Sequence, residues 1–114
     1  MQRNRTLPAR RVARLRVADL EIDALDRRIM QGSRALRLSP SEHTLLYILA
    51  ARHGTVVGYR EIGDALGLGP EVRANTVARH VTSLRRKLGA NVARTRYIET
   101  VPRVGYRFGA VPAK

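Results

Sequence analysis

Apolar residues in the first third of the chain alternate with polar ones. Leu15 and Val17, then Leu20 and Ile22, are interleaved with charged residues, and a period of two is typical of half-buried strands. Further along, Gln31-Gly32-Ser33 supplies turn-forming residues between two short apolar segments. Residues 15–38 are therefore predicted to form a small antiparallel sheet of three or four short strands.

The spacing of apolar residues then becomes helical. Ser39-Pro40-Ser41-Glu42 combines a capping serine, a proline suited to the first turn and the glutamate of a capping box. Leu45, Leu46, Leu49 and Ala50 follow on one face, and Gly54 is predicted to end this first helix. A brief strand is expected at 56–57, a second helix at 59–66 and a loop at 67–73.

A third helix is predicted from about Ala74 to Leu88. Val77, Val81, Leu84 and Leu88 fall within an arc of about 60° and form a core stripe. The opposite face carries no acidic residue and holds small polar side chains and arginines. After a loop over 90–95, residues 97–101 and 105–108 are predicted to form two strands joined by Pro102-Arg103-Val104.

Charge is concentrated at the two ends of the sequence. The 114 residues suit one domain and carry 22 Lys and Arg against 9 Asp and Glu, a net charge of +13. Residues 1–16 hold six arginines and no acid, and residues 73–107 hold nine basic residues and one acid. This distribution favours a folded body with one cationic surface for nucleic acid over a generally basic surface.

Composition also excludes several classes of protein. The chain has no cysteine, which rules out disulfides, thiolate zinc sites and cysteine catalysis. The longest apolar run, Leu45 to Ala51, is far shorter than the roughly 20 residues of a membrane span, so a cytoplasmic protein is expected. The scattered His43, His53 and His80 suggest no metal site, with His43 expected to be exposed. No nucleophile is paired with a base and no phosphate loop is present, so neither an enzyme nor a cofactor is expected.

The predicted order of sheet, three helices and hairpin indicates an α+β winged helix-turn-helix. An α-helix fits the major groove of DNA, and small side chains let it approach the base edges. The third helix is therefore the candidate reading helix, with double-stranded DNA as the expected partner.

The sequence resembles the C-terminal DNA-binding domain of OmpR-type response regulators, the effector half of two-component systems. The resemblance covers about residues 15–109. It is carried by Leu36-Arg-Leu-Ser-Pro-Ser-Glu42, by Thr76-Val77 and His80-Val81 before Leu84-Arg-Arg-Lys-Leu88, and by Tyr97-Ile-Glu-Thr-Val101 before Gly105-Tyr-Arg-Phe108. It implies a four-stranded N-terminal sheet, a third helix in the major groove, a hairpin wing at the minor groove, and a loop before the third helix that can face RNA polymerase.

Candidate DNA contacts follow from the third helix and the wing. Base contacts are predicted for Asn75, Arg79, Thr82 and Ser83, phosphate contacts for Thr76, Arg85, Arg86, Lys87, Arg94 and Arg96, and a minor-groove contact for Arg103. The candidate polymerase loop is Leu68, Gly69, Pro70, Glu71, Val72 and Arg73. Relatives often have Arg-Gly in the wing where this chain has Pro102-Arg103, and a basic residue where it has Ser83, so no target sequence can be transferred.

The receiver half of such a regulator, with its phospho-accepting aspartate, does not fit in this chain. Residues 1–14 are therefore interpreted as a basic arm or interdomain linker, 15–109 as the winged-helix domain and 110–114 as a C-terminal tail. The chain is expected to be either an effector domain of a longer protein with a covalent receiver domain or a stand-alone one. Relatives tend to bind DNA as tandem dimers.

Two alternatives stay open at the level of sequence. A basic RNA-binding or ribosome-associated domain would use the surface charge without reading bases, and A-form major grooves exclude a helix. A protein-interaction module would use the loop at 67–74 and the exposed helix to contact polymerase. Polymerase contact can coexist with DNA binding.

Overall fold

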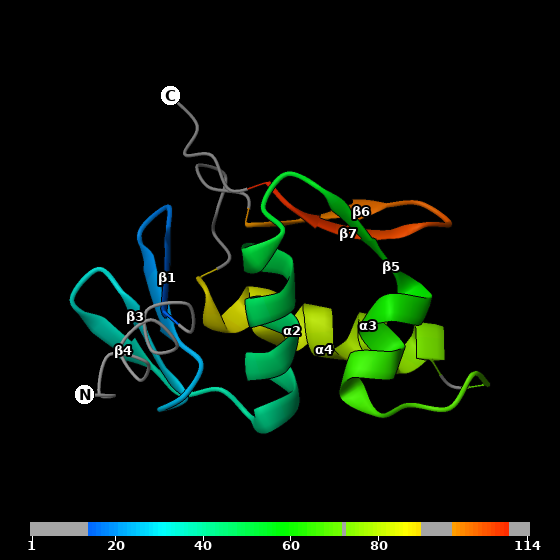
Figure 1. Ribbon diagram of the computed structural model, residues 1–114, viewed down its shortest axis with the longest axis horizontal. Helices are drawn as coiled ribbons and strands as arrows, with labels where there is room; N and C mark the ends of the chain where they lie inside the picture. Colours follow the sequence, from blue (N-terminus) through cyan, green and yellow to red (C-terminus); the bar gives the residue numbers. More distant parts are fainter. Residues whose placement is uncertain (1–13, 72, 90–96, 110–114) are drawn as a thin grey trace, which may run out of the picture.

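The computed structural model describes residues 14–71, 73–89 and 97–109, with only the backbone of Arg73. The predicted arm, apart from Arg14, and the predicted tail at 110–114 lie outside the described residues. Figure 1 shows a small sheet at one end, the helices beside it and a second sheet along one side of the helices.

The N-terminal part is a four-stranded antiparallel sheet in the order β1-β2-β3-β4. The strands are Arg14–Val17, Leu20–Asp23, Arg28–Gln31 and Arg34–Leu36, so the sheet begins one residue earlier than predicted. Leu20, Ile22 and Ile29 are buried, and Gly32 takes a positive φ of 62° in the turn between β3 and β4. The predicted sheet is thereby confirmed with four strands.

The first helix after this sheet, α2 (Pro40–Ala51), begins as predicted. The Ser39 hydroxyl accepts a bond of 3.1 Å from the Glu42 backbone N–H, and Glu42 Oε1 accepts one of 3.0 Å from the Ser39 N–H. The predicted end at Gly54 is wrong, because the helix stops at Ala51 with Arg52 as its cap. Gly54 does have a positive φ of 86°, but its N–H donates to the Phe108 carbonyl and so joins the helix exit to the hairpin.

Helices α3 (Tyr59–Leu66) and α4 (Arg73–Lys87) complete a three-helix cluster with α2. Helix α3 has the predicted bounds, and α4 is shifted by one residue toward the N-terminus. Figure 1 shows α4 running across the other two helices. The predicted stripe on α4 is part of one shared core, whose fully buried members include Leu20, Ile22, Ile29, Leu45, Leu46, Leu49, Val57, Ile62, Val77, Val81, Leu84 and Phe108.

The C-terminal hairpin pairs with the short strand between α2 and α3. Strands β5 (Val56–Gly58), β6 (Ile98–Val101) and β7 (Gly105–Phe108) form an antiparallel sheet in the order β5-β7-β6. Gly105 lies against β5 so closely that an added Cβ would stand 2.1 Å from the Val57 carbonyl oxygen. The predicted strand at 56–57 and both predicted hairpin strands are confirmed.

A hydrogen-bond network connects the N-terminal sheet to the C-terminal end of α4. Gln31 Nε2 donates to the Leu88 carbonyl at 2.9 Å and to the Tyr97 hydroxyl at 3.0 Å, and that hydroxyl donates to Asp19. Burial and then Asp19 raise the pKa of Tyr97 to about 12, so the phenol stays a donor at neutral pH. Because the last carbonyls of a helix lack partners within it, this network fixes the end of α4 to the sheet.

Candidate nucleic-acid interface

The exposed face of α4 is a narrow line of polar and cationic side chains. Asn75, Arg79, Thr82 and Arg86 are all exposed and, spaced by four, three and four residues, share an arc of about 60°. The buried Val77 and Val81 lie on the opposite side. Helix α4 contains no acidic residue, and among the described residues neither Arg79 nor Arg86 makes an ion pair.

One flank of this line is held by the N-terminal turn of α2. Ser83 Oγ donates to Glu42 Oε2 at 2.6 Å, and Lys87 Nζ donates to Glu42 Oε1 at 2.7 Å. The Glu42 side chain is only 7% exposed. Burial raises the pKa of Glu42, but the bonds from Lys87, Ser83 and the Ser39 N–H outweigh burial and lower the pKa to about 2. Glu42 is therefore a carboxylate at neutral pH.

The two hydroxyls predicted to read bases already have acceptors in the protein. Besides the Ser83 bond to Glu42, Thr82 Oγ1 donates to the Ala78 carbonyl of its own helix at 3.0 Å. Thr82 is exposed, whereas Ser83 and the predicted phosphate contact Thr76 are half-buried at the edge of the face. Each hydroxyl keeps its lone pairs for an incoming donor.

The other flank of α4 is tied to the wing through Arg85. Its Nη2 donates to the Ile98 carbonyl at 2.8 Å and to Thr100 Oγ1 at 3.0 Å, and its Nε donates to the same carbonyl at 3.3 Å. From the sequence, Arg85 is predicted to contact phosphate alone. In the structure its guanidinium also connects β6 to α4.

The turn of the wing places an arginine in a conformation that favours glycine. The Val104 N–H donates to the Val101 carbonyl at 3.0 Å, with Pro102 and Arg103 between them. Arg103 has a φ of 68°, and proline followed by a residue of positive φ is the pattern of a type II turn, which usually carries glycine there. Behind the turn, Arg107 Nη2 pairs with Glu99 at 2.8 Å across β6 and β7, and Arg103 is exposed at the tip.

The candidate polymerase loop lies between α3 and α4. Gly67 ends α3 with a φ of 73°, Leu68 packs partly against the core, and Gly69, Pro70 and Glu71 are exposed. Val72 lies outside the described residues, and Arg73 begins α4 and so belongs to the helix. The predicted phosphate contacts Arg94 and Arg96 also lie outside the described residues.

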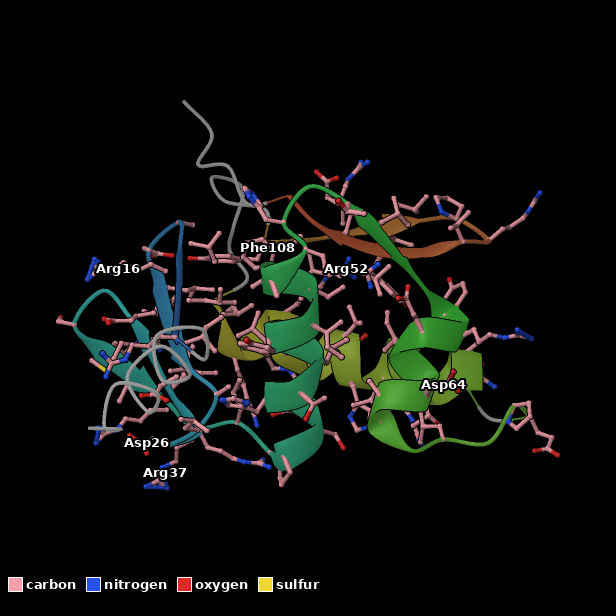
Figure 2. The ribbon with its side chains drawn as sticks, viewed as in Figure 1. Arg16, Asp26, Arg37, Arg52, Asp64 and Phe108 are labelled. Carbon is pink, nitrogen blue, oxygen red and sulfur yellow. The ribbon has the colours of Figure 1, made fainter. Side chains whose placement is uncertain are left out.

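The N-terminal sheet carries charges of both signs, unlike α4. Arg14 pairs with Asp23 at 3.5 Å, and Arg16 pairs with Glu21 at 4.0 Å. Figure 2 shows Arg16, Asp26 and Arg37 at this end of the molecule and Asp64 at the other end, on α3. The exposed face of α4, in contrast, carries arginines and no acidic residue.

His43 is buried, at 5% exposure, and its predicted exposure is wrong. This histidine lies in the first turns of α2, near the loop between β2 and β3, where burial and then the Arg27 charge lower its pKa. Its Nε2 has no hydrogen-bond partner among the described residues. Within the described residues no three His, Cys, Asp or Glu side chains gather as metal ligands. None of the described helices has the length and apolar character of a membrane span.

Comparison with known proteins identifies the family. The family model described as "Transcriptional regulatory protein, C terminal" matches residues 33–108. Protein PetR of Rhodobacter capsulatus is 35% identical over 72% of this chain and 38% of its own length. The response regulator protein PmrA of Pseudomonas aeruginosa is 32% identical over 68% of this chain and 35% of its own length. The chain thus spans little more than a third of these curated relatives.

A solved structure extends the comparison to the fold. The DNA-binding domain of RstA from Klebsiella pneumoniae, determined in complex with RstA box, superposes with a TM-score of 0.75 at 27% identity, covering 84% of this chain and 96% of that one. The α+β winged-helix prediction is thereby confirmed. The family is one of non-enzymatic transcriptional regulator domains. This chain belongs to the family of C-terminal domains of transcriptional regulatory proteins, as its resemblance to OmpR-type effector domains predicted.

Proposed function

We propose that this domain binds double-stranded DNA in a sequence-specific manner as the effector of a transcriptional regulator, with α4 in the major groove and the β6–β7 wing at the minor groove. The observation that carries the proposal is the exposed, acid-free line of α4, backed by a buried stripe that holds the helix rigidly. Membership of the regulator family and the DNA complex of RstA support it.

The proposed contacts fall into base and backbone sets. Asn75, Arg79, Thr82 and Ser83 face the bases, and Arg103 enters the minor groove, where narrow A·T-rich segments attract arginine. Phosphates are held by Thr76, Arg86 and Lys87, with Arg94 and Arg96 from outside the described part. Arg85 can join them through Nη1, because its hydrogen bonds to other described residues come from Nε and Nη2.

A selection of bound sites from random duplex DNA at moderate salt tests the proposal. We expect an enriched motif, repeated with a spacing of about one helical turn if two copies bind in tandem. Duplex RNA of the same sequence should compete poorly, because a side chain cannot read its deep major groove. Tight binding without an enriched motif, or equal competition by duplex RNA, would contradict sequence-specific recognition and favour a general basic nucleic-acid-binding role.

Further partners are proposed for the whole protein. The relatives are nearly three times as long as their matched segments, and we infer that a covalent receiver domain controls this effector in a cytoplasmic two-component regulator. The exposed Gly69, Pro70 and Glu71 are proposed to contact RNA polymerase. Replacing these three residues should reduce transcription from the selected site while leaving DNA affinity unchanged. A parallel loss of DNA affinity would instead place the loop in the DNA interface.

A further inference from the structure

The hydroxyl of Ser83 has a fixed hydrogen-bond polarity. Its oxygen lies 2.6 Å from Glu42 Oε2, and an ionised carboxylate only accepts hydrogen bonds. The single hydroxyl proton of Ser83 must therefore point at Glu42. What remains for a partner outside the protein is the pair of acceptor lone pairs on Oγ.

Three donors keep the Glu42 carboxylate in this role. Oε1 accepts from the Ser39 N–H at 3.0 Å and from Lys87 Nζ at 2.7 Å, while Oε2 accepts from Ser83. Their bonds also hold the pKa of Glu42 near 2, against its burial. Because both oxygens of the Glu42 carboxylate accept hydrogen bonds, the carboxylate stays in place, and we expect the bond from the Ser83 hydroxyl to persist when DNA binds.

An acceptor on the reading helix discriminates among bases in a definite way. In the major groove adenine and cytosine present amino donors, whereas guanine and thymine present carbonyl acceptors. Phosphate oxygens are acceptors as well. A hydroxyl without an available proton can therefore bond an amino group but neither a keto oxygen nor the DNA backbone.

We propose that Ser83 is a specificity-determining residue that selects adenine or cytosine over guanine or thymine at one position of the strand that it contacts, with Glu42 as the buried positioning residue that sets its polarity. The inference rests on the proposed sequence-specific DNA binding. Lys87 keeps two further ammonium protons for phosphate, so its bond to Glu42 does not prevent a backbone contact.

Glu42→Gln gives a sharp test because the structure dictates how the amide must orient. The Ser39 N–H and Lys87 both donate to Oε1, so the carbonyl oxygen of the glutamine takes that place. Its NH₂ group then takes the place of Oε2 and donates to Ser83. The Ser83 proton is freed, and the hydroxyl can donate to a keto oxygen of guanine or thymine.

The experiment compares site selections from random duplex DNA for the wild-type domain, Ser83→Ala, Glu42→Gln and the control Ser33→Ala. We expect one motif position at which the strand facing Ser83 is rich in adenine or cytosine in the wild type. This preference should be lost in Ser83→Ala, shift toward guanine or thymine on that strand in Glu42→Gln and be kept in Ser33→Ala. The control removes an exposed hydroxyl in the turn between β3 and β4, outside the proposed DNA contacts.

A second measurement does not depend on the folding of Glu42→Gln. The selected adenine is replaced by purine, which lacks the 6-amino group, or the selected cytosine by 2-pyrimidinone, which lacks the 4-amino group. Wild-type affinity should fall about three- to tenfold, the size of one neutral hydrogen bond, and Ser83→Ala should bind both duplexes equally.

The outcomes separate the inference from the proposed function. A wild-type affinity that does not change when the amino group is removed at the Ser83-dependent base pair would overturn the acceptor role, and so would a wild-type motif that Ser83→Ala leaves unchanged at every position. An equal effect of the base analogues on wild type and Ser83→Ala would overturn it too. If the wild type enriches no motif, sequence-specific binding itself fails, and the inference falls with it.

Discussion

Among single residues, Glu42 connects the first turn of α2 to the proposed DNA-binding face of α4. It completes the capping box of α2 through Ser39 and reaches Ser83 and Lys87 on α4. A buried carboxylate is stable only when hydrogen bonds and a countercharge offset the loss of hydration. Both conditions are met here, so the first turn of α2 fixes the orientation of the reading helix.

The buried carboxylate makes stability depend on pH. Because its pKa falls from 4.5 to about 2 on folding, the stabilisation by Glu42 is complete above pH 4.5 and is lost as the pH falls toward 2. The full effect corresponds to about 3 kcal/mol. Urea unfolding of the wild type and Glu42→Gln between pH 7 and 2 should show a stability difference that shrinks across this window. A constant difference would rule out the ionised state as its source.

Arg79 lies on the central line of α4 and is exposed. Arg79→Ala should cost roughly 1–3 kcal/mol on the best site and relax the preference at one position, because a base contact is lost. Arg86→Ala serves as the comparison, since a phosphate contact weakens all sequences alike. Kd values on the selected site and on single-base variants measure both effects. Equal losses on every sequence would identify Arg79 as a phosphate contact.

Arg103 combines backbone strain with a proposed DNA contact. Its φ of 68° is easily adopted only by glycine, so Arg103→Gly should stabilise the fold by about 1 kcal/mol. The same change removes the side chain proposed for the minor groove, and DNA affinity should fall. Urea unfolding and a DNA titration are expected to move in opposite directions. A gain in both would leave Arg103 without a role in binding.

At the scale of elements, the wing depends on strands from two regions of the sequence. Strand β7 lies between β6, its hairpin partner, and β5, which follows α2 some 50 residues earlier. The close contact at Gly105 lets the two backbones meet. The wing is therefore anchored to the helices and is not an isolated hairpin, which would be marginally stable alone.

Gly105→Ala tests this anchoring. Since the added Cβ would lie 2.1 Å from a backbone oxygen of β5, β5 and β7 must separate, at a cost of about 3 kcal/mol. Gly69→Ala is the matched control, because its Cβ would meet only Glu71 Oε1 at 3.5 Å. Thermal unfolding should show a large loss for the first variant and almost none for the second. Similar melting temperatures would argue against a tight β5–β7 contact.

For the molecule as a whole, the net charge of +13 governs the ionic component of DNA binding. Each phosphate neutralised releases counterions, so log Kd should rise steeply with log salt, by about 0.9 per phosphate. Arg86→Ala should lower this slope by about one, whereas Arg28→Ala, exposed on the N-terminal sheet, should not. Titrations at several salt concentrations measure the slope. Equal slopes for both variants would mean that charge acts without a defined site.

Local features of the fold were predictable because their causes are local. The capping box of α2, the bounds of α3 and the turns at Gly32 and Pro102 follow from residues within a few positions of one another. Gly54 was misassigned as the helix end because its backbone bond runs to Phe108, a partner that no local pattern identifies. His43 was expected to be exposed because helical spacing does not reveal a sheet folded against that face.

The sequence alone determined the order of elements, the stripe that faces the core and the acid-free face of α4. These features follow from the spacing of apolar residues and the positions of charged residues, which can be read directly from the sequence. Tertiary structure decided which polar atoms on that face are free. Ser83 and Lys87 meet Glu42 more than 40 residues away, and Arg85 holds the wing strand. Those contacts depend on how helices and strands pack in space, because hydrogen bonds form within about 3 Å whatever the separation in sequence.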